Sequence, residues 1–308
     1  MNHRLPSSDS WATARGSVEL DPFLVIGILD LPTGVVSNGG DPLTGDPLAE
    51  RALQMQVAGA GMLDVGVPGD GPVPALSEGD ELRRVIPALR SLAAQIDLPI
   101  SVNTRRASVA RAALDEGAAV VHDVSGFSFD PELVGVVADS AAGLLLMHLR
   151  TDSDEGPDGG FADLLMEVAV ELGEATQLAV DAGIEVGRIA LDPGIGFDGS
   201  PGRSLAMIRE MGLLDEAGFP VVLGPAPQAR AASADVPPSH DGPVAEAVVS
   251  ALAWERGVRV FRVRHVEAVV EALNLVRQMV EDDPVASAVL ATSGSGEDDG
   301  EPDPPVPS

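Results

Sequence analysis

The chain contains no cysteine and no lysine among its 308 residues. Without cysteine there are no disulfides, no thiolate nucleophile and no zinc–thiolate site. The five histidines are scattered, which argues against a metal site built from histidine. No apolar run has the length of a membrane-spanning helix, and residues 1–20 lack the apolar core of a secretion signal. We therefore expect a soluble, cytoplasmic protein.

Positive charge is also scarce. All 19 basic residues are arginine, against 48 acidic residues, and the net charge is −29. Such acidity argues against nucleic acids and anionic membranes as partners. An acidic surface stays hydrated at high salt, where its self-repulsion is screened, so the composition indicates the cytoplasm of a halophile. A G+C-rich genome would also favour arginine over lysine, but it does not account for the number of acidic residues.

The two ends of the chain differ in composition from its middle. Residues 1–20 are polar without periodicity, and we expect a flexible lead there. Residues 282–308 are rich in Asp, Glu, Pro, Ser and Gly, a composition that buries too little apolar surface to order itself. We therefore predict one folded domain over residues 21–281 and a disordered acidic C-terminal tail.

Eight short apolar runs lie between these ends. They are rich in Val, Ile and Leu without strict alternation, as is typical of parallel strands buried on both faces. Helical patterns separate them, which predicts an α/β fold, a (β/α)8 TIM barrel. A doubly wound open sheet is the competing architecture, but no GxGxxG motif follows the first run. The runs are Phe23–Leu29, Met62–Val65, Pro99–Val102, Ala119–Val121, Gly143–Met147, Arg188–Leu191, Phe219–Leu223 and Val258–Val263. The helical patterns cover residues 47–60, 78–95, 106–117, 131–141, 161–182, 202–216, 243–256 and 266–280.

Most of the runs end in polar residues, at the barrel face where TIM barrels hold their active sites. The most informative segment is Leu191-Asp-Pro-Gly-Ile-Gly-Phe197. Asp192 is suited to bind a polar ring edge and Phe197 to cover a flat ligand, which together indicate a heteroaromatic ligand. The alternative is a tight turn whose aspartate caps the next helix. The strand tips are Asp30, Asp64, Asn103, His122, Met147, Asp192, Gly224 and Arg262.

These motifs, in this order, resemble those of dihydropteroate synthase. That family is a pterin-binding barrel of folate biosynthesis, a transferase that joins 6-hydroxymethyl-7,8-dihydropterin pyrophosphate to para-aminobenzoate. The resemblance extends from about Phe23 to Val280. The segments that carry it are Gly27–Asp30, Ser37–Gly40, Asp64–Gly66, Arg84–Pro87, Ile100–Thr104, Asp123–Gly126, Leu146–His148, Leu191–Phe197 and Phe261–Val263.

The resemblance implies roles for individual residues. Asp192 would accept hydrogen bonds from the amino-pyrimidine edge of the pterin, and a carboxylate suits that donor-rich edge. Asp30 would bind Mg²⁺ through oxygen, and Arg262 with Arg264 would hold the pyrophosphate. The implied pterin-binding set is Asp192, Asn103, His122, Met147, Phe197 and Gln228. The resemblance also implies a homodimer formed through the last helices.

Several positions depart from the family pattern. Asn103 replaces an aspartate, His122 an asparagine and Gln228 a lysine. In the loops after the first and second strands, Gly34 replaces an acid and Gly71 an arginine. Departure of the pyrophosphate needs cations and hydrogen-bond donors, so these losses predict weakened or lost synthase activity. No residue is assigned as catalytic.

Three functions remain open from the sequence. The first is a divergent synthase that keeps its activity. The second is a non-catalytic paralogue that binds a pterin or acts as a regulatory or partner subunit. The third is a related barrel that transfers a methyl group from a methylated tetrahydropterin to a corrinoid, for which a pyrophosphate site is not needed.

Overall fold

The computed structural model describes residues 9–31, 46–67, 76–148, 161–195, 207–208, 218–224 and 242–281. The chain divides into two compact units, residues 1–273 and 274–308. All the described strands belong to the first unit. Within the described residues, no helix is both long and apolar enough to cross a membrane.

Eight parallel strands form a barrel. Their order in the sheet is β8-β7-β6-β5-β4-β3-β10-β9, and a parallel bridge between Leu191 and Val221 joins the two ends. This arrangement confirms the predicted TIM barrel. The strands are β3 (Leu24–Asp30), β4 (Met62–Gly66), β5 (Ile100–Asn103), β6 (Val120–Asp123), β7 (Gly143–Met147), β8 (Ile189–Asp192), β9 (Val222–Leu223) and β10 (Val260–Val263).

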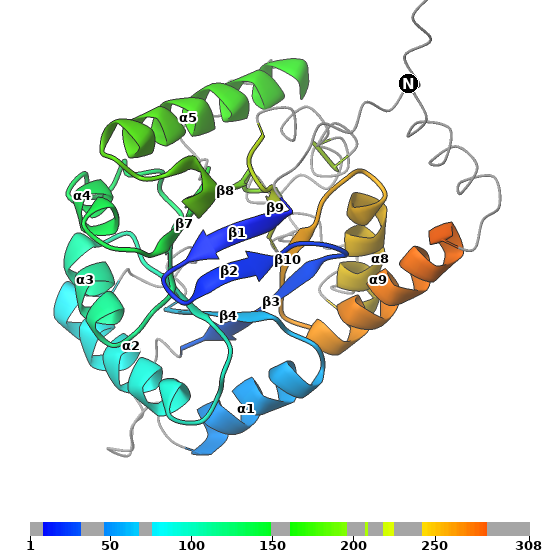
Figure 1. The fold of residues 1–308 in the computed structure, drawn as a ribbon, viewed down its shortest axis with the longest axis horizontal. Coiled ribbons are helices and arrows are strands. Elements are labelled where there is room, and N and C mark those ends of the chain that lie inside the picture. The colour runs from blue at the N-terminus through cyan, green and yellow to red at the C-terminus, as the bar shows by residue number, and fades with distance from the viewer. Residues whose placement is uncertain are drawn as a thin grey trace, which may run out of the picture. The chain divides into compact units, whose positions relative to one another are not determined.

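Helices surround the strands (Figure 1). Within unit 1 their apolar faces pack on the outward-facing strand residues, in a core that includes Leu89, Val109, Leu133 and Phe261. The helix expected at residues 202–216 lies outside the described residues, apart from Met207 and Ile208. The described helices are α1 (Asp46–Val57), α2 (Glu78–Ala93), α3 (Ala107–Asp115), α4 (Leu133–Ala138), α5 (Phe161–Asp181), the short 3-10 helix η2 (Val186–Arg188), α8 (Pro243–Trp254) and α9 (Val266–Glu281).

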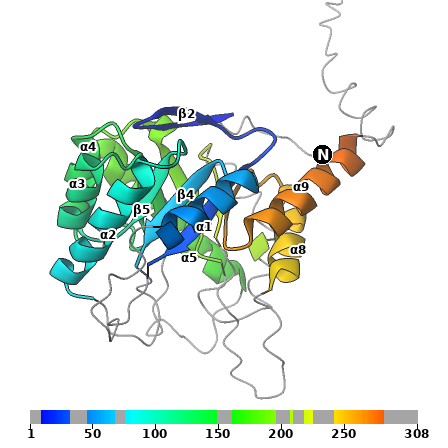
Figure 2. The ribbon, with the colours of Figure 1, turned by 90° about the horizontal axis from the view of Figure 1, so that it is seen from below.

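The expectation of a flexible lead is wrong for residues 9–20. Strands β1 (Ser10–Thr13) and β2 (Gly16–Glu19) form an antiparallel hairpin that lies across one end of the barrel (Figure 2). Trp11 is fully buried there, and its indole nitrogen donates to the Arg188 carbonyl at 2.9 Å. A buried tryptophan with a satisfied N–H anchors this short hairpin, although the hairpin's other residues are mostly polar.

The hairpin closes the barrel interior at the N-terminal ends of the strands. Trp11 and Leu20 pack in one apolar cluster with the inward-facing residues at that end. Among these residues are Ile26, Met62 and Val260. The interior is therefore filled at this end, and what remains for chemistry is the opposite end of the same strands.

Candidate functional site

The character of the barrel interior changes along each strand. Inward-facing side chains recur every second residue, and the inward residues next to the hairpin are apolar. Two positions further along, the inward residues on four of the strands are charged or ionisable. Met62 is followed by Asp64, Val120 by His122, Ala190 by Asp192 and Val260 by Arg262. We call these four residues, together with Asn103 and Met147, the polar ring.

One side of the polar ring is a buried ion pair. Asp64 Oδ2 accepts a hydrogen bond from Arg262 Nε at 2.6 Å, and both side chains are almost fully buried. Burial alone would raise the pKa of Asp64, but the charge of Arg262 and the contact with His122 hold that pKa well below its usual range. The same carboxylate raises the pKa of Arg262 against the opposing effect of burial. Asp64 is therefore a carboxylate whose charge is matched inside the protein.

His122 is attached to the same carboxylate. Its Nδ1 lies 3.1 Å from Asp64 Oδ2, and the histidine side chain is fully buried. The other ring nitrogen, Nε2, is buried without a hydrogen-bond partner among the described residues. A buried polar atom without a partner is costly unless a ligand or water satisfies it.

Asp192 lies on the other side of the polar ring. Its Oδ1 accepts from the Gly194 backbone N–H at 2.8 Å, whereas the buried Oδ2 lacks a partner in the described part of the chain. Burial raises the pKa of Asp192, and the bond from Gly194 opposes this only in part. The first oxygen therefore serves the tight turn, as the alternative interpretation expected, whereas the ligand role of the second stays a prediction.

Glycines leave room for the Asp192 carboxylate. A Cβ added at Gly224, after β9, would lie 2.7 Å from Asp192 Oδ2. Gly194 adopts φ +67°, and a Cβ there would overlap the His148 carbonyl oxygen. The turn after β8 thus requires glycine, since L side chains rarely adopt this backbone conformation.

Asn103 and Met147 complete the polar ring. Asn103 is paired in register with His122, and Met147 with Asp192. Met147 is buried, and Asn103 is half-buried. The predicted pterin-binding residues Asn103, His122, Met147 and Asp192 therefore come from four consecutive strands at one end of the barrel.

Asp30 and Arg264 lie at the rim, beyond the buried pair. Arg264 contacts Asp30 Oδ2 through Nε and Nη2, both at 3.4 Å, and about two-fifths of each side chain is exposed. Both of the predicted pyrophosphate-binding arginines are thus at this end of the barrel. Arg262 is buried and held by Asp64, whereas Arg264 has an exposed guanidinium.

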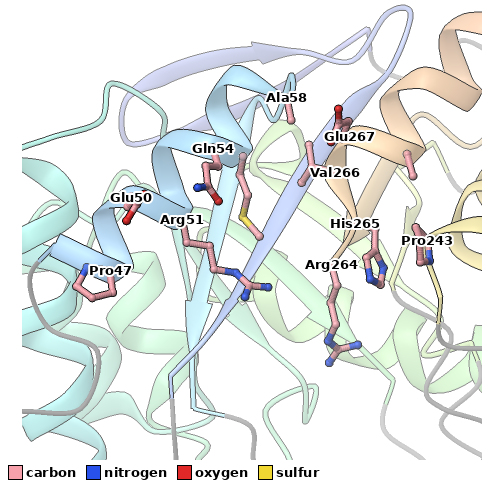
Figure 3. A pocket seen from close by; sticks show the side chains of 12 residues that line it. Pro47, Glu50, Arg51, Gln54, Ala58, Pro243, Arg264, His265, Val266 and Glu267 are labelled. Atoms are coloured by element: carbon pink, nitrogen blue, oxygen red, sulfur yellow. The ribbon is translucent and has the colours of Figure 1, made fainter.

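A cavity of about 670 Å³ lies beside the rim, between α1 and the start of α9 (Figure 3). Arg51 reaches from α1 toward Arg264, and His265 also lines the cavity. Glu50 and Glu267 line it as well, so its charge is mixed. Asp64, His122 and Asp192 do not line it, and the cavity is distinct from the polar ring.

Comparison with known proteins places these residues in a family. A family profile described as "Pterin binding enzyme" matches residues 26–264. The chain belongs to this family. It is 36% identical over 270 residues to the dihydropteroate synthase of Mycobacterium leprae, which covers 84% of this chain and 94% of that protein.

Solved structures of dihydropteroate synthase share the fold. The Xanthomonas albilineans enzyme with 4-aminobenzoic acid is 31% identical, has a TM-score of 0.78, and the match covers 90% of this chain and 100% of that one. The same enzyme in complex with 7,8-dihydropteroate is 31% identical with a TM-score of 0.73, covering 87% and 97%. The predicted resemblance to dihydropteroate synthase is confirmed.

Some positions of the pterin-binding family site lie outside the described residues. These are Phe197 and Gln228, together with Gly34 and Gly71 in the two loops. Their predicted roles stay predictions. No group of three or more metal-ligating side chains occurs within the described ranges, and Asp30 is the one carboxylate that the sequence proposed as a metal ligand.

Two further outcomes concern His148, outside the polar ring, and Asp64, within it. His148 has Nε2 3.0 Å from Glu171 Oε2 on α5. The sequence predicted Asp64 as a strand tip, but it did not predict the contacts of Asp64 with Arg262 and His122. The signal that points to this pairing is a charged residue inside the apolar run Met62–Val65, where an ionised side chain requires a partner.

Proposed function

We propose that this chain binds a pterin at the polar ring, in the manner of dihydropteroate synthase. The observation that carries the proposal is the buried Oδ2 of Asp192, which has no hydrogen-bond partner among the described residues. A carboxylate oxygen only accepts, so it selects a ligand with N–H donors on a flat edge. The 2-amino and N3–H groups of a pterin provide such an edge. Met147, paired in register with Asp192, offers an apolar surface to the ring.

The synthase reaction would proceed at the rim. The amine nitrogen of para-aminobenzoate forms a C–N bond to the methylene carbon of the dihydropterin while the C–O bond to pyrophosphate breaks. Arg264 is positioned to contact the departing pyrophosphate, because its guanidinium is exposed. The charge of Arg262 is matched by Asp64, so Arg262 stabilises the leaving group less. We therefore propose that synthase activity is weakened or lost.

Asp30 is the residue that would hold Mg²⁺. Its carboxylate is partly exposed, and its contact with Arg264 is long at 3.4 Å. Mg²⁺ is usually bound by one or two carboxylates, several waters and substrate phosphates, so a single carboxylate fits it. The ion would supply positive charge beside the pyrophosphate. Omission of Mg²⁺ should then weaken binding of the pterin pyrophosphate and leave binding of plain pterin unchanged.

Two other functions use the same polar ring. A non-catalytic pterin-binding paralogue, acting as a regulatory or partner subunit, is favoured by the engagement of Arg262 with Asp64. Methyl transfer to a corrinoid is favoured by the presence of Asn103, His122 and Asp192 on adjoining strands, since it needs no pyrophosphate site. Formation of dihydropteroate in an assay with para-aminobenzoate would exclude the paralogue.

We further propose that the protein forms a homodimer and that it works in a salt-rich cytoplasm. Val244, Val248 and Leu252 recur every fourth residue on α8 and are exposed, as expected of an interface helix. Val248→Asp should then lower the mass measured by sedimentation.

The net charge of −29 supports the proposal of a salt-rich cytoplasm. The midpoint of thermal unfolding should then rise as KCl is raised to molar concentration.

The decisive experiment is a fluorescence titration of plain pterin and of dihydropterin pyrophosphate, in molar KCl with Mg²⁺. Asp192→Asn keeps the side-chain shape and removes the charged acceptor, and we expect affinity for both ligands to fall about 10- to 100-fold. Asp181→Asn, at the exposed end of α5, is the matched control and should bind as the wild type does. Unchanged affinity in Asp192→Asn would contradict the proposal.

A further inference from the structure

Three buried atoms of the polar ring lack a partner among the described residues. One is Asp64 Oδ1, whose carboxylate is already held by Arg262 through Oδ2, and the other two are Asp192 Oδ2 and His122 Nε2. The Asp192 and His122 side chains are almost completely buried, with exposed fractions of 1% and 0%. Their strands, β6 and β8, are separated by β7 alone, and Asp192 is near enough to His122 for the two groups to interact electrostatically. A ligand that satisfies Asp192 is therefore also offered a nitrogen of His122.

The protonation of His122 follows from its contact with Asp64. Asp64 Oδ2 receives Arg262 Nε at 2.6 Å and faces His122 Nδ1 at 3.1 Å. Because a carboxylate beside an arginine is ionised and only accepts hydrogen bonds, Nδ1 must carry a proton. In the neutral imidazole the other nitrogen then has a free lone pair, so Nε2 is an acceptor.

We propose that Asp64 fixes His122 as the tautomer protonated on Nδ1, so that Nε2 and Asp192 Oδ2 form a pair of acceptors that selects a ligand with two N–H donors on one edge. The inference rests on the proposed pterin-binding function and adds a specificity-determining residue to it. Asp64 is a positioning residue, since it acts on the ligand through His122. The chemical class selected is a 2-amino-pyrimidine ring, whose exocyclic amine carries two hydrogens.

A ligand that presents an acceptor at the same position is rejected. Lumazine has a carbonyl where pterin has the 2-amino group, and its oxygen would face both acceptors. Unpaired acceptors of this kind discriminate strongly between ligands of nearly equal shape. We expect wild-type protein to bind lumazine at least about 100-fold more weakly than pterin.

The first test is ¹⁵N NMR of the full chain labelled in its histidines, in molar KCl. Five histidines contribute signals, and the pair lost in His122→Asn belongs to His122. We expect a protonated Nδ1 and an unprotonated Nε2 without ligand, and a shift of the Nε2 signal when pterin is added. A proton on Nε2 in the free protein, or an unmoved Nε2 signal in pterin-bound protein, would overturn the inference.

The second test compares ligands and does not require the NMR assignment. His122→Phe removes the acceptor and keeps a flat ring, so pterin affinity should fall about 5- to 10-fold. The ratio of the pterin affinity to the lumazine affinity should also fall by a similar factor. His122→Asn, which retains an acceptor oxygen, should restore most of the pterin affinity. An unchanged preference in His122→Phe would overturn the inference.

A control separates this inference from the proposed function. His148→Gln alters a histidine that is paired with Glu171 outside the polar ring, and it should change neither affinity nor preference. If the wild type binds no pterin, the proposed function fails, and with it the recognition half of the inference. If the wild type binds pterin but Nε2 is protonated, the inference alone fails.

Discussion

Asp64 and Asp192 are two buried aspartates of one polar ring, yet their surroundings are opposite. Asp64 is held by an arginine and a histidine, and its pKa is lowered. Asp192 accepts one backbone hydrogen bond through Oδ1, its Oδ2 has no partner in the described part of the chain, and its pKa is raised. The charge of the first carboxylate is matched by Arg262, whereas the second has no ion-pair partner among the described residues.

This difference teaches how to separate structural from functional charge in a barrel. Both aspartates lie toward the end of an apolar strand, so their positions in the sequence do not distinguish them. A matched buried charge avoids the cost of an unpaired one, whereas an unmatched charge costs stability that a bound ligand offsets. Substitutions that change one side of the polar ring at a time test this difference.

The largest effect is expected on the matched side. Asp64→Ala leaves the buried Arg262 without its partner, which should lower the free energy of unfolding by about 3–5 kcal/mol. Urea unfolding, monitored by circular dichroism, measures this loss of unfolding free energy. The double variant Asp64→Leu with Arg262→Met replaces the pair by apolar groups and should recover most of the loss. If Asp64→Ala were as stable as the wild type, the ion pair with Asp64 would not be required to keep Arg262 buried.

A smaller effect is expected from crowding the unmatched side. Gly224→Ala places a Cβ 2.7 Å from Asp192 Oδ2, which is too close for an ordinary contact, so the carboxylate must shift from its present position. Pterin affinity should fall about 10-fold, and stability should fall by about 1 kcal/mol through overpacking. Gly135→Ala in α4, whose Cβ meets nothing within 4 Å, is the control and should not weaken binding. Equal affinities in the two variants would contradict the prediction.

The smallest effect concerns stability on the unmatched side. Because the pKa of Asp192 is raised in the folded state, its penalty is absent below about pH 3.9, the usual pKa of aspartate, where both states are protonated. The penalty grows as pH rises through the folded-state pKa. Asp192→Asn should therefore be more stable than wild type at pH 7 by about 1 kcal/mol. The difference between the two melting temperatures, measured from pH 4 to pH 8, should shrink toward low pH; a gap that stays constant would argue against ionisation as the cause.

Much of the fold was predictable because the strands are continuous apolar runs. All eight runs became strands, since segments buried on both faces need no alternation to be recognised. The hairpin was missed because its two strands have four residues each and mostly polar side chains. Its anchor, Trp11, packs against residues far along the chain, and periodicity within a short window does not contain that information.

The candidate site was predictable in its location and less so in its chemistry. Asp192, Asn103 and His122 were expected at the strand tips and lie there. The pairing of Asp64 with Arg262 joins residues 198 positions apart and depends on how neighbouring strands are staggered around the barrel. The protonated nitrogen of His122 depends in turn on that pairing, so it too required the three-dimensional arrangement.

The hairpin has a consequence for how the chain is made. Synthesis runs from the N-terminus, so Trp11 leaves the ribosome long before Arg188, its hydrogen-bond partner 177 positions later. Ala14, whose backbone N–H donates to the Ala119 carbonyl, likewise waits for its partner. The first strands to be made therefore cannot complete these hydrogen bonds until residues as late as Arg188 have been synthesised.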